Sequence, residues 1–188
     1  MSSLDETFKE LLERLRSSGA LNPATSDPIF YFVYPPEKML ELKKCLPRWT
    51  SALGKAGYKV LRVSLGDLLW QAIEESGRWD DTLELEAGAD LGELNAAVQD
   101  VLAQSSGLAD RVAAVVEGAP PDTVVLLTEA ELLHPYFRTR TIESRLQDLV
   151  RARTVVFYPG RRSGQYGLHF LDVHPFDGNY RSTLLGGT

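Results

Sequence analysis

Two glutamates follow an apolar, β-branched run in the second half of the chain. Glu129 and Glu131 come directly after residues 123–128, TVVLLT, which predict a buried strand. Carboxylates at the end of such a strand can hold Mg²⁺ or activate a water molecule. The same side chains can instead cap a helix or pair with arginines. The sequence leaves both interpretations open, and together with Asp67 the glutamates support a less favoured hypothesis, a Mg²⁺-dependent enzyme.

Other catalytic and metal-binding chemistry has little support among the residues. Residues 34–38, YPPEK, follow the first predicted strand, where a phosphate site needs glycines and free backbone N–H donors. The two prolines remove donors, and Glu37 repels phosphate. The single cysteine, Cys45, is expected in a helix as a core thiol, and three late histidines match no standard metal-ligand spacing. We therefore expect no catalytic residues, no bound metal and no cofactor.

Aromatic and arginine side chains gather in two segments late in the chain, HPYFRTR at 134–140 and YPGRRSGQYG at 158–167. Tyrosine and arginine are enriched at the centres of protein interfaces, and they can also stack on bases and pair with phosphates. A sequence pI near 5.1 and the lack of a longer basic stripe favour a protein partner over nucleic acid. The predicted partner-binding residues are Tyr136, Arg138, Arg140, Arg161, Arg162, Tyr166 and Arg181.

The net charge of −6 is distributed unevenly along the 188 residues. Between Asp67 and Asp100 there are ten acidic residues and one base, Arg78. Between His134 and Arg181 there are eight arginines and four acidic residues. This pattern predicts a dipolar surface, whose acidic part is suited to a second, basic partner.

Strand-like and helix-like segments alternate along the chain. Short apolar runs predict strands at 29–34, 58–63, 123–128 and 154–158, with two weaker strands at 166–173 and 179–185. The strand at 154–158 is expected to end at Pro159-Gly160. Apolar periodicity predicts helices at 37–56, 67–76, 91–104, 108–117 and 141–151, and the acidic stretch 78–90 is expected to be a loop or a frayed helix.

This alternation is typical of a three-layer α/β fold, with a mostly parallel sheet and helices on both faces. We expect a degenerate nucleotide-binding-like topology without a phosphate loop. A single domain is predicted over 1–188, with an N-terminal helix at 1–19 and a disordered tail at 186–188. No apolar run approaches the 18 or so residues that a membrane helix requires, so we expect a cytoplasmic protein with no membrane contact.

Several blocks carry a family resemblance: IFYFVYPPE at 29–37, YKVLRVSLGDLL at 58–69, HPYFRTRTIESRLQ at 134–147, and TVVFYPGRRSGQYGLHFLD at 154–172 with DGNYRSTLL at 177–185. In this order they resemble the BrxB family of bacterial phage-exclusion (BREX) systems. The resemblance implies a small component of a multi-protein system that methylates host DNA and blocks replication of unmodified phage. It also implies assembly with a phosphatase-like PglZ protein and with a PglX-like methyltransferase, and it supplies no catalytic residues.

The residues and the resemblance together predict a non-enzymatic structural or interaction subunit of a BREX-type defence complex. Its expected partner is the PglZ-like component, contacted through the arginines and tyrosines named above. The alternative is a nucleic-acid-binding adaptor of the same system, which would use the same arginines.

Overall fold

A computed structural model describes residues 3–17, 28–104, 107–147, 152–164, 166–178 and 180–187. The helices in these ranges are α1 (Leu4–Ser17), α2 (Met39–Lys55), α3 (Leu65–Glu75), α4 (Trp79–Glu86), α5 (Leu91–Ala103), α6 (Leu108–Glu117) and α7 (Thr139–Leu146), with 3-10 turns η1 (Pro36–Lys38) and η2 (Ala130–Leu133). The strands are β1 (Ile29–Tyr34), β2 (Lys59–Ser64), β3 (Thr123–Thr128), β4 (Arg153–Ser163), β5 (Gly167–Phe170) and β6 (Thr183–Gly186).

The strands form a six-stranded sheet whose order is β2-β3-β4-β1-β6, with β5 paired to the end of β4. All pairings along this path are parallel, and only the β4–β5 pair is antiparallel. Because the strands run in one direction, their carboxyl ends meet at one edge of the sheet, where α/β proteins hold ligands. The expected mostly parallel sheet is confirmed.

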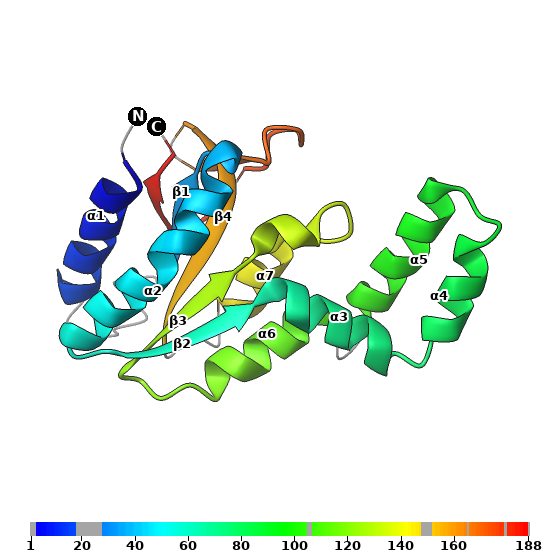
Figure 1. Cartoon of the computed structure of the whole chain (residues 1–188), viewed down its shortest axis with the longest axis horizontal. Coiled ribbons are helices and arrows are strands. Elements are labelled where there is room, and N and C mark those ends of the chain that lie inside the picture. Colours follow the sequence, from blue (N-terminus) through cyan, green and yellow to red (C-terminus); the bar gives the residue numbers. More distant parts are fainter. Residues whose placement is uncertain are drawn as a thin grey trace.

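Both faces of the sheet are covered by helices, so the expected three layers are also confirmed (Figure 1). Successive side chains of a strand point to opposite faces. In β1, Tyr31 therefore belongs to the core that includes residues of α3, α6 and α7, while Phe32 belongs to the core that includes residues of α1 and α2. Such doubly covered strands need apolar residues at every position, and all six residues of β1 are buried.

Two helix starts follow the local rules of capping. The Ser3 hydroxyl accepts from the Glu6 N–H at 3.2 Å, and the Glu6 carboxylate accepts from the Ser3 N–H at 2.7 Å. Asp90 and Glu93 form the same reciprocal pair at the start of α5. These pairs satisfy backbone donors that have no partner inside the helix. The expected stop of the first helix at residue 19 lies outside the described residues.

Of the two alternatives expected for 78–90, a loop or a frayed helix, the structure has a helix, α4, over residues 79–86. In Figure 1, α4 and α5 stand side by side at the end of the molecule away from β1 and β6. They are joined to the sheet through α3 and α6, which α5 contacts. None of the described ranges contains a helix that is both long and apolar enough to cross a bilayer.

The C-terminal elements also differ from the sequence prediction. β4 does not end at Pro159-Gly160 but continues to Ser163, since its last residues leave the parallel sheet and pair with β5. Gly160 has a φ of 157°, and a side chain there would collide with the carbonyl oxygen of His169. The two weak strands shrink to β5 and β6, and β6 pairs in parallel with β1.

The structure differs from the sequence prediction at two boundaries, the start of the C-terminal tail and the start of the helix predicted at 141–151. Gly186 closes β6, and the Gly187 carbonyl accepts from the Arg162 N–H at 3.1 Å, so neither residue belongs to a disordered tail. The helix predicted at 141–151 begins earlier, at Thr139, and is α-helical to Leu146. Residues 148–151 of that prediction lie outside the described part of the chain.

Candidate interaction site

Three cavities adjoin one another around α7; we call them the α7 cavities. Their volumes are about 480, 150 and 650 Å³. Arg138 lines the first and the second, and Tyr180 lines the second and the third. The two shared side chains join the cavities into one band of surface.

The α7 cavities collect five of the seven predicted partner-binding residues. Tyr136 and Arg138 line the first cavity, and Arg140, Tyr166 and Arg181 line the third. They come from the segment before α7, from α7 itself, from the β4–β5 turn and from the segment before β6. The fold therefore brings together side chains that lie up to 45 positions apart in the sequence.

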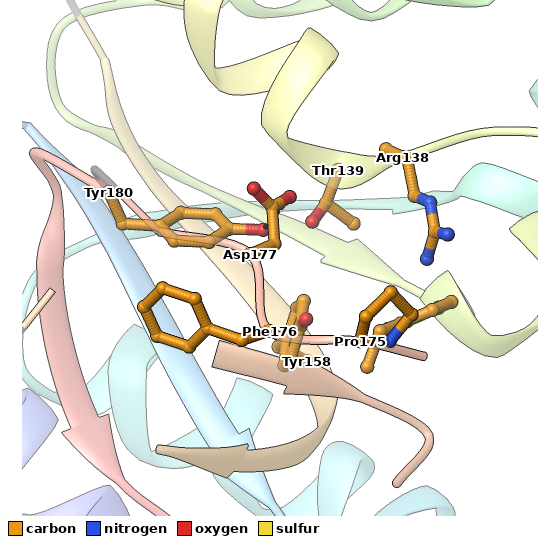
Figure 2. Close-up of a pocket in the computed structure, with 8 residues that line it drawn as sticks. Arg138, Thr139, Tyr158, Pro175, Phe176, Asp177 and Tyr180 are labelled. Carbon is orange, nitrogen blue, oxygen red and sulfur yellow. Dashed lines mark hydrogen bonds between the residues drawn. The ribbon is translucent and has the colours of Figure 1, made fainter. Parts of the chain in front are cut away.

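The middle cavity is lined by residues of α7, β4, β5 and the segment between β5 and β6 (Figure 2). Figure 2 shows the Asp177 carboxylate between the Tyr180 ring and Thr139, with the Arg138 side chain beyond Thr139. The Tyr180 hydroxyl donates to Asp177 Oδ2 at 3.3 Å. Burial raises the pKa values of Tyr158 and Tyr180, so both phenols stay neutral hydrogen-bond donors at physiological pH.

Glu143 fixes the position of Arg181 from inside the protein. Its carboxylate is 2% exposed and accepts from the backbone N–H groups of Arg181 and Ser182 at 3.1 and 3.0 Å. The Ser182 hydroxyl donates to the same oxygen. A buried carboxylate with several donors is well satisfied, and here it ties α7 to the segment that carries Arg181. Sequence analysis missed Glu143, although an acidic residue between inward-facing Ile142 and Leu146 is a signal for such an anchor.

The guanidinium groups of this band are not all neutralised. Arg140 pairs with Asp177 at 3.0 Å. Arg138 and Arg181 are exposed, and neither makes an ion pair with another residue in the described ranges. An exposed guanidinium presents donors in a planar fork that matches a carboxylate or a phosphate. The band thus offers cationic donors beside the exposed ring of Tyr166.

The remaining two predicted arginines lie elsewhere, on the extended end of β4. Arg161 pairs with Asp172 at 2.9 Å, and Arg162 donates to the Leu184 carbonyl at 3.3 Å. Neither residue lines the α7 cavities. Sequence proximity to Tyr166 grouped them with the others, but the hairpin directs them to contacts within the chain.

A pair of histidines lies close to the middle cavity. His134 Nδ1 and His174 Nε2 share a hydrogen bond, and the His174 ring stacks on Phe170. Partial burial, followed by the nearby charges of Arg138 and His134, lowers the pKa of His174. His174 is therefore neutral at pH 7. In the part of the chain that the structure describes, no three His, Cys, Asp or Glu side chains are grouped to hold a metal ion.

Glu129 and Glu131 meet at the carboxyl-terminal edge of the sheet, with Lys43 of α2 between them. Lys43 Nζ lies 3.1 Å from Glu129 Oε1 and 3.0 Å from Glu131 Oε1. The Ser64 hydroxyl donates to Glu129 Oε2 at 2.6 Å. We call these four residues the edge cluster. The Asp67 backbone N–H donates to the Ser64 hydroxyl, which caps α3.

The edge cluster balances its own charge in part. The Ser64 hydrogen bond, and then Lys43, lower the pKa of Glu129 against the effect of partial burial. Burial alone would lower the pKa of Lys43, but Glu131 and Glu129 raise it overall. Glu129 has a φ of 63°, which is uncommon for a residue other than glycine. Lys43 thus takes the place between the two carboxylates that an external cation would need.

The comparison with known families finds a match over about two thirds of the chain. The model of the family described as BREX protein BrxB matches residues 61–185. This range begins within β2 and includes β3–β6 and every residue of the α7 cavities. No curated protein and no solved structure matches the chain.

Proposed function

The chain belongs to the BrxB family and is a component of a BREX phage-defence system, and from this premise we propose that it works as a non-enzymatic interaction subunit. Its partner in this proposal is the phosphatase-like PglZ component. A PglX-like methyltransferase is a further member of the same assembly. The band of α7 cavities is the surface that we assign to the PglZ contact.

The observation that carries this proposal is that Arg138 and Arg181, in a hollowed surface, make no ion pair with any residue that the structure describes. An acidic group on a partner can fill each cavity and complete the hydrogen bonds that these side chains lack inside the described chain. Tyr136 and Tyr166 supply rigid aromatic area on either side. Arginine and tyrosine anchors around a cavity are typical of interface centres.

The edge cluster supports a role without catalysis. A Mg²⁺-dependent reaction at Glu129 and Glu131 needs their oxygens free for the metal. Lys43 pairs with one oxygen of each carboxylate and Ser64 donates to the second oxygen of Glu129, while Glu131 Oε2 is buried without a hydrogen-bond partner among the described residues. After β1, the chain enters η1 through Pro35 without a glycine-rich turn.

Copurification of the tagged chain with coexpressed BREX proteins tests the proposal. The variant R138E/R181E reverses both guanidinium charges and is expected to reduce recovery of the PglZ-like partner about tenfold or more. The control is Arg16→Glu, which makes one such charge reversal at an exposed arginine of α1, on the opposite face of the sheet. The control is expected to retain the partner.

Each other outcome has a definite meaning. Equal recovery of the PglZ-like protein by R138E/R181E and Arg16→Glu would overturn the assignment of the surface. Recovery of nucleic acid alone, released by nuclease and by raised salt, would favour the nucleic-acid adaptor instead. Mg²⁺-dependent activity that disappears in Glu129→Gln would overturn the non-enzymatic role.

A further inference from the structure

An apolar stripe crosses η2, α3 and α4, and none of its residues lines the α7 cavities. Trp70 is 52% exposed, and its ring centroid lies 6.0 Å from that of Trp79 in an edge-to-face contact. Leu83 follows Trp79 by one helical turn and is 45% exposed. At the other end, Leu132 of η2 lies against Gly66, one turn before Trp70. Four large apolar side chains thus follow one another across η2, α3 and α4.

The helix that carries half of this stripe has little support from the rest of the chain. α4 contains eight residues and none of them is buried. Residues 83–88 are all exposed, as is Leu91 at the start of α5. An isolated helix this short is marginal in water, because few hydrogen bonds offset the cost of nucleation. Contact with another molecule would bury Leu83 and stabilise α4.

The charge around the stripe indicates what kind of molecule fits. We call residues 67–100, which contain ten acidic residues and one base, the acidic arm. Of these acids, Glu75 pairs with Arg111 from α6. Asp67, Glu74, Asp80 and Glu84 lie on α3 and α4 beside the stripe and are exposed or half-buried at the helix surface. A second copy that presented this same surface would place like charges opposite each other, which is unfavourable.

We propose that the acidic arm docks a basic amphipathic segment of a partner protein. Its apolar side chains would pack on Trp70 and Leu83, and its lysines or arginines would face the flanking carboxylates. The apolar stripe and the carboxylates of α3 and α4 beside it are separate from the residues that line the α7 cavities. The inference goes beyond the proposed function, since it gives the chain a second docking surface of opposite charge.

The test uses the full chain and a synthetic amphipathic helical peptide made of leucine and lysine as the probe. Titration calorimetry measures affinity, and hydrogen exchange measures protection of residues 79–93. We expect binding with increased protection of α4. The variants W70A and L83S are each expected to weaken binding about tenfold, which corresponds to about 1.4 kcal/mol. Leu40→Ser is the matched control, because Leu40 is an exposed leucine on α2.

Two further arms separate apolar docking from simple charge attraction. A peptide with alanine in place of leucine is expected to bind about tenfold more weakly. The variant E74Q/D80N is expected to weaken binding of the leucine–lysine peptide, and this loss should decrease as the salt concentration is raised. The proposal would be overturned if the alanine–lysine peptide bound as tightly as the leucine–lysine peptide. It would also be overturned if Leu40→Ser weakened binding as much as W70A and L83S do. Self-association that W70A and L83S abolish would assign the surface to a second copy instead and would also overturn it.

The variant R138E/R181E, which changes the α7 cavities, distinguishes this inference from the proposed function. It is expected to bind the leucine–lysine peptide like the unmodified chain. Loss of the PglZ-like partner with retained peptide binding supports both surfaces. If R138E/R181E retains the PglZ-like partner while W70A loses peptide binding, only the assignment of the α7 cavities is contradicted.

Discussion

The edge cluster and the α7 cavities both gather charged side chains, but the opposite charge comes from different places. In the edge cluster, Lys43 contacts Glu129 and Glu131, so the chain supplies both signs itself. In the α7 cavities, Arg140 has Asp177, while Arg138 and Arg181 have no ion-pair partner among the described residues. Charges that are satisfied inside a chain contribute to its fold, and charges left open are available to another molecule.

This difference also separates two kinds of polar residue at the α7 cavities. Glu143 is buried and accepts hydrogen bonds from within the chain, and in this way it holds Arg181 in place. Arg138 and Arg181 are exposed, so their removal leaves no buried group without a partner. Mutations of the first kind should change stability, and mutations of the second kind should change binding alone.

The largest expected effect is on Glu143. Glu143→Ala removes the acceptor of two backbone N–H groups and of the Ser182 hydroxyl, and we expect a loss of about 3 kcal/mol in the free energy of unfolding. Partner binding should fall as well, because Arg181 loses its anchor. Urea unfolding and copurification measure the two effects. Glu143→Gln keeps an acceptor oxygen and should lose less, and equal losses in both variants would contradict the anchoring role.

A smaller loss is expected at the edge cluster. Lys43→Ala leaves Glu131, whose side chain is 9% exposed, beside Glu129 without a cation. We expect a loss of about 2 kcal/mol in urea unfolding, reduced from the value for a fully buried pair because Lys43 is partly exposed. Partner binding should not change, unlike in Glu143→Ala.

The control for this variant is Lys44→Ala, which removes an exposed charge from the neighbouring position. Its expected effect on unfolding is within about 0.5 kcal/mol. Similar stability of Lys43→Ala and Lys44→Ala would show that the edge cluster does not contribute to the fold, and it would remove the contrast between the two regions.

The smallest expected effect is the dependence of stability on pH. The pKa of Glu129 is lowered in the folded state, so the unfolded chain binds the proton more readily. The contribution of Glu129 to the free energy of unfolding is fully present above the ordinary glutamate pKa, about 4.3. It is lost as pH falls through the lower pKa of the folded state. Urea midpoints measured on either side of that value should fall toward acid pH. The urea midpoint of Glu129→Gln should fall less steeply with decreasing pH. An unchanged slope would contradict the assignment of this pH dependence to Glu129.

Sequence patterns predicted the layers of the fold because they depend on local periodicity. The continuous apolar run of β1 requires cover on both faces, and the structure places α1 and α2 on one face and α3, α6 and α7 on the other. The capping pairs of Ser3 with Glu6 and of Asp90 with Glu93 could also be predicted from the sequence, since each pair lies within one helical turn. The helix α4 was less clear because Leu83 and Leu85 are exposed and only Trp79 packs against the core, which gives no inward periodicity.

The candidate site was only partly predictable from the sequence. Five of the seven predicted residues line the α7 cavities, because aromatic and arginine residues cluster in the segments that surround α7. Arg161 and Arg162 were grouped with them by sequence proximity alone. The antiparallel pairing of β4 with β5, which continues through Gly160, directs them to Asp172 and Leu184.

The sequence by itself determined the alternating elements, the apolar faces and the unequal distribution of charge, since each follows from residue type and short-range spacing. Only the tertiary structure decided which charges meet. Lys43 and Glu129 are 86 positions apart, and Glu143 and Ser182 are 39 apart. Such pairs form because the strand order places α2 beside the end of β3, and α7 beside the segment before β6. Local periodicity carries no information about that order, so the partners of the charged side chains could be known only from the fold.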